Sequence, residues 1–83
     1  MKVTVKYFAS IREAIGVGSE VRDTSAASLG ALRDELVALG GAYAECLARG
    51  KSVRLALNQV MCNESATLTE GAEVAFFPPV TGG

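Results

Sequence analysis

The side chains that most often perform catalysis or hold metals are scarce in this chain. Its 83 residues include no histidine and only two cysteines, Cys46 and Cys62. Zinc sites usually need several cysteine or histidine ligands, and a serine or cysteine nucleophile usually needs a histidine base. The carboxylates are scattered, with no spacing that would form an acid–base pair. Gly16-Val17-Gly18 lacks the further glycine of a phosphate-binding loop. We therefore expect no metal, no bound cofactor and no catalytic set of side chains.

Composition and charge narrow the class of partner and the compartment. The net charge is −1, from 8 basic and 9 acidic residues, and no basic cluster exists to bind nucleic acid or an anionic membrane. The N-terminus has no apolar signal-peptide core, and the uncharged run 74–83 is too short to span a bilayer. These features predict a cytoplasmic protein with reduced cysteines, with a Cys46–Cys62 disulfide as the alternative.

The group with unusual potential is the end of the chain itself. Pro78-Pro79 favours an extended exit from the last strand, and Gly82 and Gly83 have no side chains. Such a narrow ribbon fits a tunnel that excludes larger residues. The α-carboxylate of Gly83 is unreactive as it stands, but adenylation would make it an acylating agent. A sulfur donor would then convert it to a thiocarboxylate, a strong nucleophile. The alternative is an inert, flexible tail.

Alternating residues predict the strands that must position this tail. Val3, Val5 and Tyr7 share one face of a first strand, and Lys2, Thr4 and Lys6 share the other. A shorter strand is expected over 19–24, a third over 51–58 with a continuation or short partner at 60–61, and a last one over 73–77. Pro78 ends the last strand because proline cannot donate to a ladder.

Leucine spacing predicts the main helix. Ser28 is the expected N-cap, and the buried stripe is Leu29, Leu32, Leu36 and Leu39. Gly40-Gly41 should end this helix, and one or two further turns are expected over 42–49, with Leu47 inward. A short helix over 11–15 would be capped by Ser10 and closed by Gly16.

This order of elements predicts an α+β domain, a ubiquitin-like β-grasp. Its mixed sheet of about four or five strands would be covered by one main helix. The first and last strands would pair in parallel at the sheet centre. We assign residues 1–77 to this domain and 78–83 to an extended C-terminal tail ending in Gly-Gly.

An apolar patch is predicted on the open face of the sheet, beside the tail. Phe8 breaks the alternation of the first strand and falls on the same face as the lysines. Phe77 and Ala75 face the same way on the last strand, and Met61 extends the patch. Exposed contiguous apolar surface on a small protein usually marks a partner site. The alternative is that a loop covers this face.

The residues at both ends of the chain resemble a known family. The C-terminal run GAEVAFFPPVTGG (71–83), the start VTVKYFA (3–9) and the element Leu57-Asn58-Gln59 are similar to the MoaD/ThiS-type sulfur carriers, which include the small subunits of molybdopterin synthase. The resemblance is weakest over 17–52. Ala72 stands where the family often has aspartate, a difference in a turn that leaves the proposed chemistry unchanged.

The resemblance implies a function for the tail. An ATP-consuming, ubiquitin-activating-like adenylyltransferase would activate Gly83, and sulfur transfer would give its thiocarboxylate. The carrier would then dock on the large synthase subunit in a heterotetramer and donate sulfur to cyclic pyranopterin monophosphate for the molybdenum cofactor. Phe8, Met61 and Phe77 match interface positions of the family. The segment that would enter the large subunit is Pro78, Pro79, Val80, Thr81, Gly82 and Gly83.

Three alternatives share parts of this interpretation. A ubiquitin-like protein modifier would use the same adenylated Gly83 to conjugate to lysines. A sulfur carrier of another pathway would use the same thiocarboxylate with a different acceptor. A plain interaction domain would carry an inert tail. In all of them the chain is not an enzyme on its own.

Overall fold

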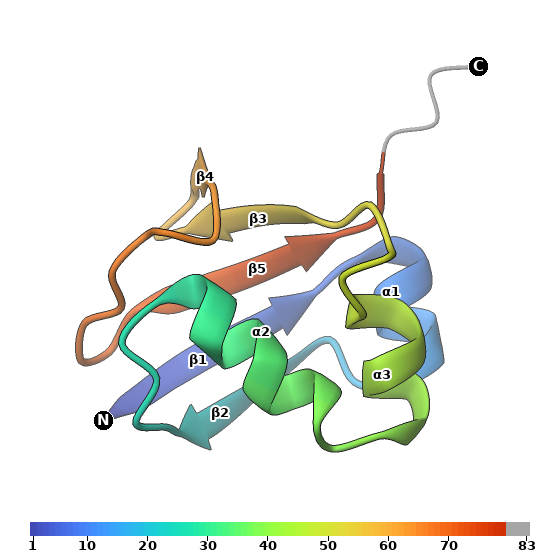
Figure 1. Cartoon of the computed structure of the whole chain (residues 1–83), viewed down its shortest axis with the longest axis horizontal. Coiled ribbons are helices and arrows are strands. Elements are labelled where there is room, and N and C mark those ends of the chain that lie inside the picture. The colour runs from blue at the N-terminus through green and yellow to red at the C-terminus, as the bar shows by residue number, and fades with distance from the viewer. Residues whose placement is uncertain (80–83) are drawn as a thin grey trace.

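The fold is one mixed sheet with helices packed against one face, in a computed structural model that describes residues 1–79 (Figure 1). The sheet order is β2-β1-β5-β3-β4. The strands are β1 (Lys2–Tyr7), β2 (Ser19–Asp23), β3 (Arg54–Leu57), β4 (Val60–Cys62) and β5 (Glu73–Phe77). The helices are α1 (Ala9–Ile15), α2 (Leu29–Val37) and α3 (Gly41–Leu47). The prediction of a β-grasp is confirmed; α2 is the main helix, and two shorter helices accompany it.

The central strands β1 and β5 run parallel, as predicted. Their register pairs Thr4 with Glu73 and Tyr7 with Phe76, and the remaining pairs of neighbouring strands are antiparallel. The pairing extends one residue beyond β1, where the Phe8 N–H donates to the Phe76 carbonyl at 3.2 Å. Pro78, the first residue of the C-terminal tail, therefore follows β5 at the end of the sheet where β1 also ends.

The core lies between the sheet and the helices. The inward residues of β1 and β5 meet the leucines of α2, and the most deeply buried large side chains are Tyr7, Phe76, Leu29, Leu32, Leu36, Leu47, Val3, Val5 and Val74. Leu39 was predicted in this stripe but is half exposed (50%). The helix ends at Val37, and Gly40 has a positive φ of 77° that turns the chain into α3. Leu39 therefore lies beyond the buried face.

The helix caps agree with the sequence at two positions and differ at one. The Ser28 side chain accepts a hydrogen bond from the Ala31 N–H at 3.2 Å, and Gly16 closes α1 with a φ of 95°. Ser10, predicted as a cap, lies inside α1, whose N-cap is Phe8. Because Phe8 is held extended by its bond to β5, the helix begins earlier than the serine indicates.

The turn between α3 and β3 is held by a buried arginine of α2. The side chain of Arg33 is 5% exposed. Its Nε donates to the Leu47 carbonyl at 2.6 Å, and its Nη2 donates to the carbonyls of Ala48 (2.9 Å) and Lys51 (3.1 Å). The guanidinium thus binds the carbonyls at the C-terminal end of α3, where the partial negative charge of the helix dipole favours a cation. None of the helices described is long and apolar enough to cross a membrane.

Candidate functional site

Two aromatic rings stack on the face of the sheet opposite the helices. Phe8 follows β1 and Phe77 ends β5, and the parallel pairing of these strands brings them together. Their ring centroids lie 4.5 Å apart with an interplanar angle of 9°. Phe8 is 39% exposed and Phe77 is half-buried. The prediction that these two residues share the open face is confirmed, and no loop of the described chain buries them.

Met61 completes an exposed patch, and Ala75 lies beneath it. The registers place Met61 opposite Ala56 and Ala56 opposite Ala75. Met61 is 56% exposed, whereas Ala75 is only 6% exposed. Ala75 was predicted as part of the exposed surface; it is on this face but its short methyl group lies among longer neighbours. We call Phe8, Met61 and Phe77 the aromatic patch.

A hollow of about 330 Å³ joins the aromatic patch to the root of the tail. It is lined by Phe8, Ala9, Arg54, Met61, Phe77, Pro78 and Pro79. The two prolines also line a second hollow of about 240 Å³, whose other walls include Cys46 and Lys51. Pro78 and Pro79, which form the root of the tail, therefore lie between two hollows. A partner bound to the aromatic patch would also contact these two prolines.

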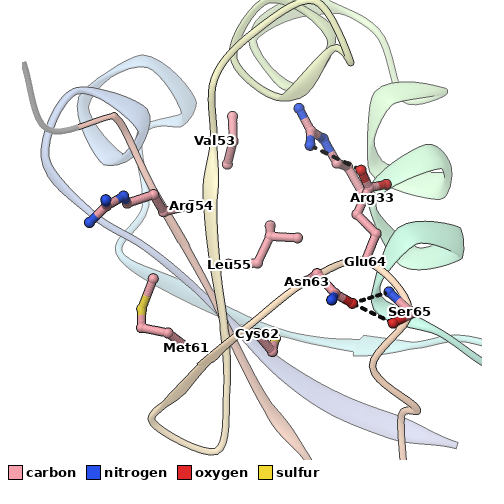
Figure 2. Close-up of a pocket in the computed structure, with 9 residues that line it drawn as sticks. All are labelled: Arg33, Val53, Arg54, Leu55, Met61, Cys62, Asn63, Glu64 and Ser65. Carbon is pink, nitrogen blue, oxygen red and sulfur yellow. Dashed lines mark hydrogen bonds and ion pairs between the residues drawn. The ribbon is translucent and has the colours of Figure 1, made fainter.

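The largest of these three hollows, about 790 Å³, lies between β3 and the chain from Met61 to Ser65 (Figure 2). Figure 2 shows Arg54 and Met61 on one side of β3 and Arg33 and Glu64 on the other. Several of its polar groups are paired with one another: Arg33 Nη1 lies 3.7 Å from Glu64 Oε2, and Asn63 Oδ1 accepts from the Ser65 N–H at 2.9 Å. Side chains satisfied in this way do not form a reactive set.

The cysteine and acidic side chains of the described residues do not gather into one site. Within residues 1–79, no three histidine, cysteine or acidic side chains gather where they could hold a metal ion. Both cysteines are free, and burial raises the pKa of the Cys62 thiol, which disfavours its reactive thiolate. On the open face, Lys6 pairs with Glu73 at 3.3 Å.

Most residues of the predicted C-terminal tail lie outside the described part of the chain. Pro78 and Pro79 are placed at the patch, as expected from their position after β5. Val80, Thr81, Gly82 and Gly83 lie outside the described residues. Arg54 was not predicted as a member of the site. The alternation of Arg54 and Ala56 with Leu55 and Leu57 is the signal that could have placed it on the open face.

Comparison with known proteins connects this face and tail to a family. The model of the ThiS family matches residues 5–83. The chain belongs to the ThiS family. The molybdopterin synthase sulfur carrier subunit of Haemophilus influenzae is 38% identical over 81 residues, covering 98% of this chain and 99% of the relative. The family resemblance predicted from both ends of the sequence is therefore confirmed.

Solved structures support the same assignment. A chain of the complex of subunits 1 and 2 of the molybdopterin-converting factor from Helicobacter pylori matches with a TM-score of 0.70 and 28% identity, covering 100% of both chains. SAMP1 from Haloferax volcanii, a small archaeal modifier protein, matches with a TM-score of 0.79 and 25% identity, covering 100% of both chains. This ThiS-family chain thus resembles both a synthase subunit and a modifier.

Proposed function

We propose that this ThiS-family chain is the sulfur carrier subunit of a molybdopterin synthase. The observation that carries the proposal is the aromatic patch at the root of a tail that ends in Gly-Gly. The curated relative from H. influenzae, similar over nearly the whole chain, bears this function in its name. The patch supplies the docking surface, and the chain end supplies the reagent.

The chemistry of the proposal resides in the carboxylate of Gly83. Attack of this carboxylate on the α-phosphate of ATP forms an acyl-adenylate and releases pyrophosphate. A sulfide-equivalent donor then attacks the carbonyl carbon and displaces AMP, leaving a thiocarboxylate. Its sulfur attacks a carbon of cyclic pyranopterin monophosphate and displaces an oxygen from that carbon. Hydrolysis of the resulting acyl–sulfur bond leaves the sulfur on the pterin as a thiolate and returns the carboxylate of Gly83. ATP is consumed by the activating enzyme, and this chain itself holds no cofactor or metal.

The partners of the proposal supply what this chain lacks. The large synthase subunit would bind the aromatic patch and receive the tail, and an adenylyltransferase would bind the same face during activation. The H. pylori complex of subunits 1 and 2 supports the first pairing. Neither nucleic acid nor a membrane has a role. Free Cys46 and Cys62 are typical of a reducing compartment, which supports a cytoplasmic location.

A protein modifier is the second candidate, favoured by the similarity to the archaeal modifier. It would form an isopeptide bond between Gly83 and a lysine, where the carrier would hold a thiocarboxylate. A carrier for another pathway would hold the same thiocarboxylate and differ only in its acceptor. Isopeptide adducts in cell extracts, with no thiocarboxylate, would favour the modifier.

The first test is the intact mass of the protein after incubation with the activating enzyme, ATP and a sulfur donor. We expect a gain equal to sulfur replacing one oxygen, located in the C-terminal peptide. The matched controls lack Gly83 or carry one extra residue after it, and both should keep their fold and gain nothing. An unchanged mass with an active activating enzyme would refute the carrier chemistry. If truncation after Pro79 left the function intact, the tail would be inert.

The Gly82→Ala variant distinguishes a role of Gly82 in sulfur transfer from a role in the stability of the fold. The added methyl group widens the ribbon that is proposed to enter the large subunit. We expect sulfur transfer to fall while the urea midpoint of unfolding stays unchanged. An equal loss of stability and activity would show that Gly82 serves the fold instead.

A further inference from the structure

Arg54 places a positive charge at the edge of the aromatic patch. It lies directly opposite Phe77 in the β3–β5 register and is exposed. It lines the same 330 Å³ hollow as the three patch residues and the two prolines of the tail root. None of the residues that line this hollow is acidic.

Three of the other arginines of the described chain, Arg22, Arg33 and Arg49, have a carboxylate partner. Arg12 of α1 has no ion pair among residues 1–79, but it does not line this hollow. Arg22 Nη1 lies 3.6 Å from Glu20 Oε1, and Arg49 Nη2 lies 3.0 Å from Asp34 Oδ1. The neighbouring cation of the open face, Lys6, is likewise paired with Glu73. Among residues 1–79, the side chain of Arg54 has neither an ion pair nor a hydrogen bond. Its guanidinium is therefore available to a partner.

A partner that covers the aromatic patch must remove water from this guanidinium. A charge that loses water without gaining a partner weakens binding, whereas a hydrogen-bonded charge pair fixes orientation and favours one partner over others. We propose that the large synthase subunit presents a carboxylate to Arg54, at the rim of an apolar socket that receives Phe8, Met61 and Phe77. This inference rests on the proposed function and specifies the chemistry of its docking surface.

The position of Arg54 gives the ion pair a role beyond affinity. The planar guanidinium binds a carboxylate through two parallel hydrogen bonds, which restricts rotation of one protein on the other. Arg54 and the tail root share the walls of one hollow. A carboxylate fixed on Arg54 would therefore set how Pro78 and Pro79 are presented to the partner.

The test measures binding of this protein to its cognate large subunit by titration calorimetry at two salt concentrations. Truncation of one member of a buried, hydrogen-bonded charge pair, which Arg54 would form once the partner excludes water from it, typically weakens binding at least about 30-fold. We expect that loss for Arg54→Leu and a larger loss for Arg54→Glu. Arg54→Lys keeps the charge but loses the two parallel hydrogen bonds, so its loss should be smaller than that of Arg54→Leu. The wild-type affinity should fall with added salt more steeply than that of Arg54→Leu.

Lys2→Leu is the matched control, because it removes one exposed positive charge from the far end of β1. It should bind as the wild type does. Equal affinity of Arg54→Leu and wild type, or equal losses for Arg54→Leu and Lys2→Leu, would overturn the inference. If Arg54→Leu impaired only thiocarboxylate formation, the inference would also be overturned, and Arg54 would instead have a role in binding the activating enzyme. If the folded wild-type protein did not bind the large subunit at all, the proposed function would fail instead.

Discussion

Two arginines share the carboxylate of Glu64, and their burial predicts very different effects on stability. Arg33 is 5% exposed and also binds three backbone carbonyls, whereas Arg49 is 52% exposed and binds Glu64 and Asp34. Replacing either with methionine keeps most of the aliphatic stem. Arg33→Met removes three hydrogen bonds to backbone carbonyls, of which only the Ala48 carbonyl keeps another donor, the Lys51 N–H. A hydrogen bond lost from such a site costs about 1 kcal/mol net.

The expected loss for Arg33→Met is therefore about 3 kcal/mol, within the range for breaking a buried charged network. A domain of 83 residues has a total free energy of unfolding of about 4–12 kcal/mol, so the effect is large. With a urea slope of about 1 kcal/mol per molar, the midpoint should fall by about 3 M.

Urea unfolding followed by circular dichroism measures both variants in the same buffer. Arg49→Met should shift the midpoint far less than Arg33→Met, because exposed ion pairs contribute little. This holds although Arg49 makes more contacts with carboxylates. Equal shifts for the two variants would refute the reasoning from burial, and a larger shift for Arg49→Met would show that the surface pairs hold the turn.

Three further predictions concern the cap and the titratable groups. Ser28→Ala removes the cap of α2 and should lower the free energy of unfolding by about 1 kcal/mol. Burial and the hydrogen bond to Glu20 raise the pKa of Tyr7 above its usual value. The resulting stability is fully present below about pH 10 and is lost as the pH rises further, by at most about 1.4 kcal/mol per pH unit; the wild type should lose stability there more steeply than Tyr7→Phe. The raised pKa of Cys62 predicts that, in a Cys46→Ser variant, iodoacetamide modifies Cys62 more slowly in the folded protein than in urea.

The strands were readable from the sequence because their faces differ in chemistry. The alternation of Val3, Val5 and Tyr7 with polar residues fixed both the element and its buried side, and the last strand was predicted with its observed bounds. The break at Phe8 was equally informative, because it placed this aromatic residue, which directly follows β1, on the open face. The stacking of Phe8 on Phe77 followed from parity and topology together.

Helix ends and the burial of single residues depended on tertiary contacts that no local pattern contains. Phe8 replaces Ser10 as the cap because a backbone hydrogen bond from a distant strand holds it extended. Arg33 lies off the leucine stripe and would be expected in solvent, yet the carbonyls at the end of α3 surround its guanidinium. Ala75 lies in the central strand β5 between Lys6 and Ala56 and is only 6% exposed, which parity alone does not report.

The central parallel pair explains why the patch and the tail occur together. Parallel strands end at the same edge of a sheet, so the residue after β1 and the residues after β5 must be neighbours. Phe8 and Pro78 line one hollow for this reason. An antiparallel central pair would separate the aromatic patch from the tail by the length of a strand. Under the proposed function, a partner that binds the patch therefore also meets Pro78 and Pro79 in the same hollow, and this chain needs no catalytic side chain of its own.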